Sequence, residues 1–324
     1  MTRAPQFSIV IPTRNRVGML RRALASVAAQ TFQDFETVIV DDGSSDGTAE
    51  FLQSAAVGQR KVLRHEQGSG VSAARNRGVA AAGAALVTFL DDDDELRPGA
   101  LQALHQRLQA DSQLDFVWGG RVIHEFDKAG RQIGTRADDW SDVPAQVSGS
   151  AFLDFVLKIA TNSAFTIRRE VFCAVGGFDE QLRVSEDRDL FITLAENSYR
   201  GAAVDAGVID INEHRNSLSR SGVGRVGVDS DLRVIEKHRE YLDRAQHAQF
   251  LNGYLLALFE GFLEAGNRAA AMRILVQLRQ RGALDAGIVR RYLRHAPEFR
   301  ALKSMIRYDS IRRWRSRRRS VTQP

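Results

Sequence analysis

Two short apolar runs separated by a helical repeat constrain the fold of this chain more than any other feature. Residues 7–11 end at Pro12, residues 35–40 end at Asp41, and both runs have the composition of buried strands. The segment between them repeats apolar side chains at helical spacing: Met19, Leu20, Ala23, Leu24 and Val27. A strand, a helix and a strand in this order predict a βαβ unit with parallel strands and a right-handed crossover.

The same alternation continues along the chain. The next expected elements are a helix, a strand, a helix and a strand, at residues 48–56, 62–63, 71–82 and 86–90. Repeated units of this kind predict an α/β fold, an open sheet flanked by helices, whose ligands bind at the carboxyl ends of the strands. Three strand ends deliver polar sequences to that rim, beginning at Pro12, Asp41 and Asp91.

The second part of the chain predicts shorter elements and then helices. Residues 114–134 favour short strands and turns, and residues 151–206 mix helix and strand. Later segments show apolar spacing typical of helices, at 229–247, 250–265, 268–280 and 286–295. We therefore expect three parts, an α/β domain, a helical extension and a basic tail, at residues 1–222, 223–299 and 300–324.

Positive charge is concentrated in the tail. The 324 residues carry a net charge of +5, but residues 300–319 hold nine basic side chains and one acidic one. The tail is therefore polybasic at +8, and the remainder is mildly acidic at −3. Apolar side chains recur every third residue there, which gives no continuous helical stripe. We expect peripheral contact with an anionic membrane, with nucleic-acid binding as the alternative.

Other features of the sequence bear on its location. The single cysteine, Cys173, has no partner for an intrachain disulfide. No signal-peptide pattern is present, and no apolar run reaches the roughly 18 residues of a spanning helix. We expect a cytoplasmic protein that meets a membrane, if at all, at its inner face.

Four consecutive carboxylates, Asp91, Asp92, Asp93 and Asp94, follow the apolar strand at 86–90. Neighbouring carboxylates about 6 Å apart repel by roughly 3 kcal/mol at an effective dielectric constant near 20, so the run favours a bound cation. Alternate residues of a strand share a face, which predicts that Asp91 and Asp93 project together. Mg²⁺ and Mn²⁺ prefer carboxylates together with substrate phosphates, which suits a departing diphosphate. The alternative is a solvated acidic loop before a helix near Pro98.

The segment 41–47 combines carboxylates, hydroxyls and turn glycines directly after a strand. Asp41 is in position to accept hydrogen bonds from a base or a ribose. A turn and an N-cap ahead of the helix at Thr48 explain the later residues. We expect both roles.

Four further positions carry ionisable side chains. Arg75, near the start of the helix at 71–82, suits a phosphate or carboxylate partner, whereas Arg77 is expected to be an ordinary surface arginine. Asp187 precedes an apolar-periodic helix, where it acts either as a helix-end acid or as a general base. His214 lies in a polar segment and is either a metal or diphosphate ligand or a plain loop residue.

Together these motifs resemble the family 2 glycosyltransferases. The matching segments keep a fixed order: SIVIPTRN at 8–15, QTF at 30–32, VDDGSSDGT at 40–48, ARNRG at 74–78, FLDDDD at 89–94, GGFDE at 176–180 and SED at 185–187. The resemblance implies a GT-A-type, Rossmann-like mixed sheet flanked by helices, with a C-terminal helical extension. It also implies a nucleotide-sugar half at about 1–112 and an acceptor half at about 113–222.

The resemblance implies an inverting transfer of a sugar from a nucleotide-diphosphate sugar to a saccharide or lipid-linked acceptor, with Mg²⁺ or Mn²⁺ as cofactor. Expected donor contacts are Pro12, Thr13, Arg14, Asn15, Asp41, Asp42, Arg75, Asp91 and Asp92. Expected metal contacts are Asp91, Asp93 and His214, expected acceptor contacts are Asn162 and Glu186, and the expected base is Asp187. The family usually has a small residue where this chain has Asp92, so the division of roles between residues 91, 92 and 93 stays open.

Two other readings keep the same fold. A non-catalytic nucleotide-sugar-binding or scaffolding protein would not need the acids at 91–94 and 187, which are all present. A nucleotidyl transferase would use a metal and an α/β sheet as well, but would release pyrophosphate rather than a nucleoside diphosphate. The donor base, the sugar and the acceptor are not specified by these motifs.

Overall fold

The protein is described from a computed structural model. The structure describes residues 4–54, 60–127, 129–138, 140–141, 143–157, 159, 163–214, 225–264 and 266–295. Expectations for the tail at 300–324, and for Asn162, lie outside these residues.

The first part of the chain forms the expected βα units. Its elements are β1 (Phe7–Thr13), α1 (Val17–Ala28), β2 (Phe35–Asp41), α2 (Thr48–Ser54), β3 (Arg60–Arg64), α3 (Val71–Ala81) and β4 (Leu86–Phe89). β1 pairs in parallel with β2 and with β4, and β2 pairs in parallel with β3. The predicted βαβ unit is therefore confirmed.

The next elements extend this sheet with antiparallel and parallel partners. They are β5 (Asp94–Leu96), α4 (Ala100–Ala110), β6 (Phe116–Phe126), β7 (Gln132–Ala137), α5 (Gly149–Val156), β8 (Thr166–Arg168), α6 (Arg169–Ala174), α7 (Glu186–Glu196) and β9 (Gly201–His214). The strand order is β3-β2-β1-β4-β8-β6-β9-β5, with β7 paired to β6. β8 is antiparallel to both β4 and β6, whereas β6 and β9 are parallel, so the predicted mixed sheet is confirmed.

Both faces of the sheet are buried, which explains why its central strands read as continuous apolar runs. Along β1, Phe7, Ile9 and Ile11 belong to the core on one face, together with residues of α1 and α4. Val10 points to the opposite face, where the core includes residues of α3 and α5. The alternation follows from the period of two in a strand and gives a helix–sheet–helix sandwich.

β6 and β9 are long strands, so the expectation of short strands and turns at 114–134 is wrong over the length of β6, whereas a turn between Asp127 and Gly130 and the shorter strand β7 agree with it. β6 and β9 pair over their whole lengths, with register shifts around Gly119 and Gly120. A Cβ atom at Gly119 would overlap the side chain of Val208, so the absence of a side chain lets the strands approach at the bend. Glycines that favour a turn in a short window instead provide an irregularity within one long strand.

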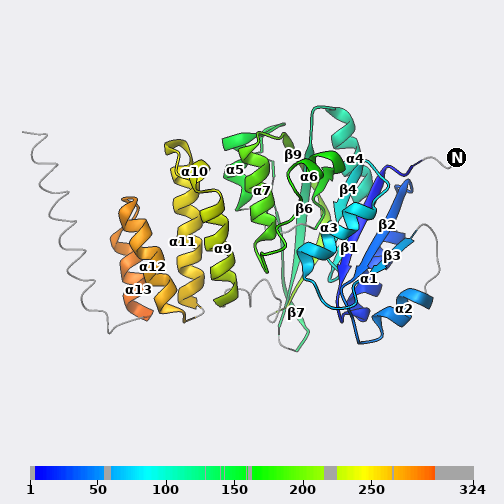
Figure 1. Cartoon of the computed structure of the whole chain (residues 1–324), viewed down its shortest axis with the longest axis horizontal. Coiled ribbons are helices and arrows are strands. Elements are labelled where there is room, and N and C mark those ends of the chain that lie inside the picture. The colour runs from blue at the N-terminus through cyan, green and yellow to red at the C-terminus, as the bar shows by residue number, and fades with distance from the viewer. Residues whose placement is uncertain are drawn as a thin grey trace, which may run out of the picture.

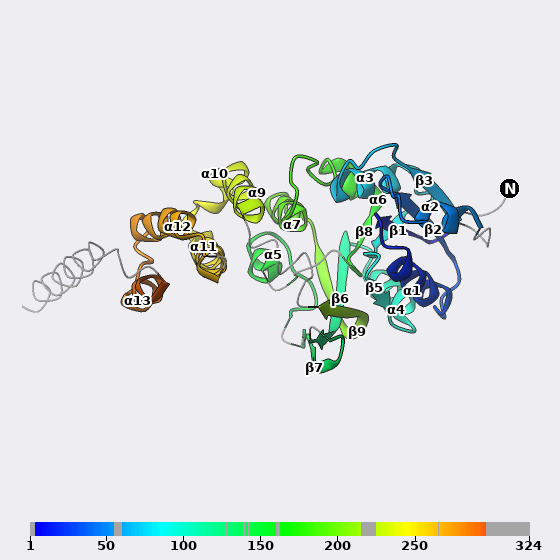
Figure 2. The ribbon, with the colours of Figure 1, turned by 90° about the horizontal axis from the view of Figure 1, so that it is seen from below.

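The helices at the C-terminal end form a row beside the sheet (Figures 1 and 2). They are α9 (Arg225–Lys237), α10 (Arg239–Leu242), the 3₁₀ helix η1 (Ala245–His247), α11 (Ala248–Glu264), α12 (Arg268–Gln280) and α13 (Ala286–His295). We call residues 225–295 the helical extension. In both views α5 and α7 lie between the sheet and this extension.

One hydrophobic cluster runs from Phe89 and Phe116 through Phe191 to Tyr254 and Tyr292, so the extension shares the core of the sheet. None of the described helices combines the length and the apolar composition that a membrane span requires.

Candidate functional site

Three loops meet at the carboxyl ends of β1, β2 and β4, as the sequence predicts. The Thr13 hydroxyl at the end of β1 donates a hydrogen bond to Asp92 Oδ2 at 2.7 Å. Asn15, in the left-handed region with φ 54°, accepts a bond from the Ser45 N–H and donates its own N–H to Ser44 Oγ. Pro12 is buried in β1, directly before this junction. The rim expected from the motifs is therefore a single surface.

The residues 91–93, which we call the acidic turn, do not continue β4. The chain turns after Phe89, the Asp94 N–H donates to the Asp91 carbonyl, and Asp94 begins β5. The expectation that Asp91 and Asp93 share a strand face is therefore wrong, because the chain must leave β4 to pair β5 with β9. The Asp91 N–H donates to Ser163 Oγ, so the residue after Asn162 lies against the acidic turn.

Two arginines hold the carboxylates of the acidic turn. Arg16 Nη1 lies 3.0 Å from Asp92 Oδ1 and 3.1 Å from Asp93 Oδ2. Arg75 Nη2 lies 2.5 Å from Asp91 Oδ1. Sequence reasoning missed Arg16, although its position in the loop between β1 and α1 places it at the same rim. Each carboxylate of the turn thus has a cation beside it in the folded chain.

Despite these two arginines, the ionised form of Asp92 and Asp93 is disfavoured in the folded chain. Burial raises the pKa of Asp92 to about 6, with a contribution from Asp93, against the opposing effects of Thr13 and Arg16. Burial and the charge of Asp91 raise the pKa of Asp93 as well. A raised carboxylate pKa means that the charged form lacks stabilisation, which a further cation would supply.

The acidic turn fits a hard divalent cation that needs only a few protein ligands. Among the described residues no three metal-ligating side chains form a group, so a site closed by protein ligands alone is not present there. Mg²⁺ needs only one or two carboxylates when substrate phosphates and water supply the other ligands. Asp91 and Asp93 meet that need, and the Asp93 side chain is 38% exposed. The backbone of His214 pairs with Phe126 at the end of β9, and its side chain lies outside the described residues.

The segment after β2 is held by its own hydrogen bonds. Asp41, which is 1% exposed, accepts bonds from the Ser44 N–H and from Arg64 Nη1. Asp46 Oδ1 accepts the N–H of Thr48 at the start of α2, so the predicted cap is confirmed. Arg64 was not predicted for the site, although its place at the end of β3 puts it at the same rim.

Asp42 fixes the loop that leads into α3. Its carboxylate accepts the N–H groups of Ser69 and Gly70, and His65 Nδ1 lies 2.6 Å away. Burial acts to raise the pKa of Asp42, but these three hydrogen bonds outweigh it and lower the pKa. Arg14 is exposed, with its guanidinium beside Gly68 in the same loop.

Arg75 joins the acidic turn to α7. Its Nη1 lies 2.6 Å from Glu186 Oε1, its side chain is 4% exposed, and its Nε is buried without a hydrogen-bond partner. Burial acts to lower the pKa of Arg75, but Asp91 and Glu186 raise it above its ordinary value, so the guanidinium stays charged. Of the two partner classes expected for Arg75, the folded chain supplies carboxylates. Arg77 is exposed, as predicted, and donates to the Arg64 carbonyl.

The first turn of α7 carries the predicted base. Ser185 precedes the helix in the left-handed region with φ 66° and makes no side-chain cap. Asp187 Oδ1 accepts the N–H of Arg188 at 2.7 Å. Burial raises the pKa of Asp187, although Arg188 and Arg75 act in the opposite direction. Burial also raises the pKa of Glu186, opposed by Arg75. A carboxylate with a raised pKa is a better proton acceptor near neutral pH.

Two relatives with similar sequences are glycosyltransferases. A protein 32% identical over 171 residues is the GalNAc(5)-diNAcBac-PP-undecaprenol beta-1,3-glucosyltransferase of Campylobacter jejuni; the match covers 50% of this chain and 55% of that protein. A PGL/p-HBAD biosynthesis glycosyltransferase of Mycobacterium tuberculosis is 32% identical over 200 residues, which are 60% of this chain and 71% of that protein. The chain thus spans only about half the length of the first of these relatives.

Solved structures of S. aureus TarS share the fold. One superposes with a TM-score of 0.64 at 20% identity, covering 87% of this chain and 50% of TarS. TarS 1–349 in complex with UDP-GlcNAc superposes with a TM-score of 0.56 at 19% identity, covering 86% of this chain and 92% of that one. The family model described as "Glycosyl transferase family 2" matches residues 8–176, just over half of the chain. The chain therefore belongs to glycosyl transferase family 2.

Proposed function

We propose that this protein transfers a sugar from a nucleoside-diphosphate sugar to an acceptor hydroxyl, with inversion at the anomeric carbon. The acceptor oxygen forms a bond to the anomeric carbon while the bond from that carbon to the diphosphate oxygen breaks. The acceptor proton passes to the Asp187 carboxylate, and the nucleoside diphosphate leaves with the electron pair of the broken bond. The proposal rests on the family, on the rim of the sheet and on α7.

One observation carries the proposal: Arg75 bonds both to the acidic turn, through Asp91, and to the first turn of α7, through Glu186. These segments are far apart in the sequence, and each holds carboxylates of raised pKa, Asp93 in one and Asp187 in the other. A base and a site for a leaving diphosphate must lie close together for a single displacement. The contacts of Arg75 with the acidic turn and with the first turn of α7 support this assignment.

The residues at the rim have separate roles in this proposal. Pro12, Thr13, Arg14, Asn15, Asp41 and Asp42 hold the nucleoside, and Asp92 positions the ribose. Asp91 and Asp93 would hold Mg²⁺ or Mn²⁺, which neutralises charge that develops on the diphosphate. Glu186 lies beside the base and is assigned to the acceptor side, as is Asn162. His214 remains a candidate metal contact.

For the substrates we propose a uridine nucleotide sugar and an acceptor carried on a lipid diphosphate. The TarS complex with UDP-GlcNAc supports the first choice, and the undecaprenol-linked saccharide in the name of the Campylobacter relative supports the second. Such an acceptor resides at a membrane. The polybasic residues 300–319 would attract the chain to an anionic, inner-leaflet surface.

Calorimetry with UDP, GDP and dTDP, each with Mn²⁺ and with EDTA, tests the donor site. We expect metal-dependent binding of UDP that Asp93→Asn abolishes. Asp187→Asn should bind UDP like the wild type but lower kcat for UDP release by about 10²–10⁴-fold, the usual contribution of a general base. Asp205→Asn, an exposed position on β9, is the control and should change neither quantity.

The outcomes separate this proposal from the alternatives. Binding of UDP without any release of UDP from nucleotide sugars would favour a nucleotide-sugar-binding or scaffolding protein. A folded protein that binds none of the nucleotides would refute the donor site. Release of pyrophosphate from a nucleoside triphosphate would favour nucleotidyl transfer.

A further inference from the structure

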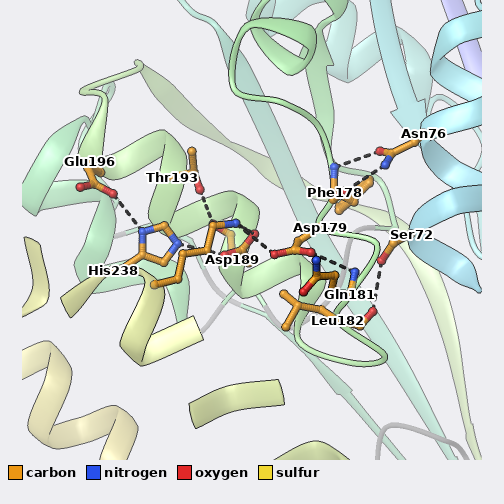
Figure 3. A network of polar contacts seen from close by, with 11 residues as sticks. Ser72, Asn76, Phe178, Asp179, Gln181, Leu182, Asp189, Thr193, Glu196 and His238 are labelled. Carbon is orange, nitrogen blue, oxygen red and sulfur yellow. Dashed lines mark hydrogen bonds and ion pairs between the residues drawn. The ribbon is translucent and has the colours of Figure 1, made fainter. Parts of the chain in front are cut away.

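The helical extension contacts the first turn of α7 through the two residues that directly follow Asp187. Arg188 Nη1 donates to Asp231 Oδ1 of α9 at 2.9 Å. Asp189 lies 2.7 Å from Nζ of Lys237, the last residue of α9, and 3.0 Å from Nε2 of His238, which follows it. Figure 3 shows His238 between Asp189 and Glu196, so it also ties the start of α7 to its end. The extension therefore holds α7 where the proposed base is located.

The contact at Arg188 joins three side chains from three helices, and the Arg188 side chain itself is 35% exposed. The Tyr254 hydroxyl of α11 donates to the same Asp231 Oδ1 at 2.6 Å, and the Arg188 guanidinium carbon lies 5.5 Å from the centre of the Tyr254 ring. Tyr254 is 1% exposed and Asp231 is 6% exposed. Burial and the charge of Asp231 raise the pKa of Tyr254, so its hydroxyl remains a donor at neutral pH. Charge-assisted bonds of this kind are short and directional, which fixes the guanidinium.

Arg188 acts on Asp187 in two ways. Its backbone N–H donates to Asp187 Oδ1, so a shift of residue 188 moves the carboxylate. Its charge also attracts that carboxylate, as does Arg75, whereas Asp231 repels it and Glu186 is the adjoining acid. Since Ser185 gives this helix end no side-chain cap, the contacts of Arg188 and Asp189 restrain the first turn instead.

We propose that Asp231 and Tyr254 form a positioning unit, which fixes the Arg188 guanidinium and through it the orientation and charge surroundings of the Asp187 carboxylate. This inference rests on the proposed function, in which Asp187 is the base. It gives the helical extension a part in the chemistry, although Asp231 and Tyr254 act only through Arg188. A purely structural role would place these residues in the core without affecting proton transfer.

Asp231→Asn and Tyr254→Phe test the proposal in the full chain. The first removes a charge and the second removes only a hydroxyl, and both keep nearly the same volume. Asp243→Asn is the matched control, because it breaks the ion pair with Arg281, an interaction within the extension. The kinetic assay is UDP release from UDP-GlcNAc and from UDP-glucose with Mn²⁺, where water takes the sugar. A second assay follows the Asp187 carboxyl ¹³C resonance with pH, assigned by its loss in Asp187→Asn.

In Asp231→Asn we expect kcat to fall by about tenfold, a fraction of the general-base contribution, while KM for the nucleotide sugar stays unchanged. The titration midpoint of Asp187 and the acid limb of kcat should both move to lower pH. The reason is that a repelling charge is lost and Arg188 becomes free to pair with Asp187. Tyr254→Phe keeps both charges, so it should lower kcat less and leave the midpoint near the wild-type value.

Several results would overturn the inference. One is an Asp187 titration in Asp231→Asn that matches the Asp243→Asn control; another is a fall in kcat with an equal rise in KM. If Asp231→Asn does not fold, Tyr254→Phe decides, and a wild-type kcat in that variant refutes the positioning role. A wild type that binds no nucleotide and releases no UDP refutes the proposed function instead, and the ¹³C titration still tests whether Asp231 controls Asp187.

Discussion

Replacing Arg75 by methionine removes a buried guanidinium but keeps most of the volume of the side chain. Its two partners, Asp91 and Glu186, then lose the cation that lies 2.5 and 2.6 Å from them. The perturbation separates the acidic turn from α7 without touching either segment directly. It therefore measures how strongly this one side chain holds the two halves of the site together.

The magnitude follows from the burial of the partners. Breaking a buried ion pair by removing one side costs about 3–5 kcal/mol. The Asp91 side chain is 27% exposed and is partly screened by water, so we expect a loss near the low end, about 3 kcal/mol. A domain with a typical stability of about 5–15 kcal/mol would remain mostly folded.

The loss should depend on pH, with a sign that the structure determines. The pKa of Glu186 is already raised by burial, and Arg75 acts against this rise, so the variant raises the pKa further. A carboxyl group with a raised folded pKa destabilises the fold only as pH rises through that pKa, because only the charged form is disfavoured. The deficit relative to the wild type should therefore be greater at pH 8 than at pH 5.

Urea unfolding followed by tryptophan fluorescence at pH 5 and pH 8 measures this deficit, since Trp118 and Trp140 are buried. Arg77→Met is the control on the same helix, because Arg77 is exposed and bonds only to a backbone carbonyl among the described contacts. A loss for Arg75→Met no greater than for Arg77→Met, or a greater loss at pH 5 than at pH 8, would refute the reasoning.

Two further predictions concern stability. Burial acts to raise the pKa of Asp189, but the bonds with His238 and Lys237 outweigh burial and lower the pKa. The Asp189 carboxylate therefore stabilises the fold above the unfolded pKa of about 3.9, and this stabilisation is lost as pH falls. Asp189→Asn should cost about 2 kcal/mol at pH 7, since Lys237 is half exposed, and an equal cost at pH 3 in urea titrations would contradict this. Gly43→Ala should lower Tm more than Gly47→Ala: both glycines have positive φ, but a Cβ at 43 would meet backbone atoms at 2.9 Å, whereas the space at 47 is open. Equal Tm values for the two variants would show that the contact at 43 relaxes freely.

Periodic features of the sequence were sufficient for much of the fold. The helices predicted at 268–280 and 286–295 coincide with α12 and α13, since both have apolar faces that recur at helical spacing. The rim was predictable for a related reason: parallel strands end on one side, so polar segments after β1, β2 and β4 had to meet there. These inferences depend on local spacing alone.

Local sequence patterns do not predict the contacts between segments that are distant in the chain. The bond between Arg75 and Glu186 joins residues 111 positions apart, and nothing in either segment specifies the other. The same holds for Asp231 and Tyr254, which read as ordinary residues of amphipathic helices until α7 is placed beside them. The acidic run was assigned to a strand because it directly follows the apolar run at 86–90. The turn that separates it from β4 serves the pairing of β5 with β9, which becomes visible only in the folded sheet.

The acidic turn is tied at both ends to strands that cannot shift. β4 is paired with β1 and β8 before it, and β5 is paired with β9 after it. An extra residue between them would slip β5 by one position against β9, and such a slip exchanges the buried and exposed faces of a strand. The length of this segment is therefore as strictly limited as its composition. The turn between β6 and β7 has no such limit, because β7 is a largely exposed edge strand, and variation in chain length is best accommodated there.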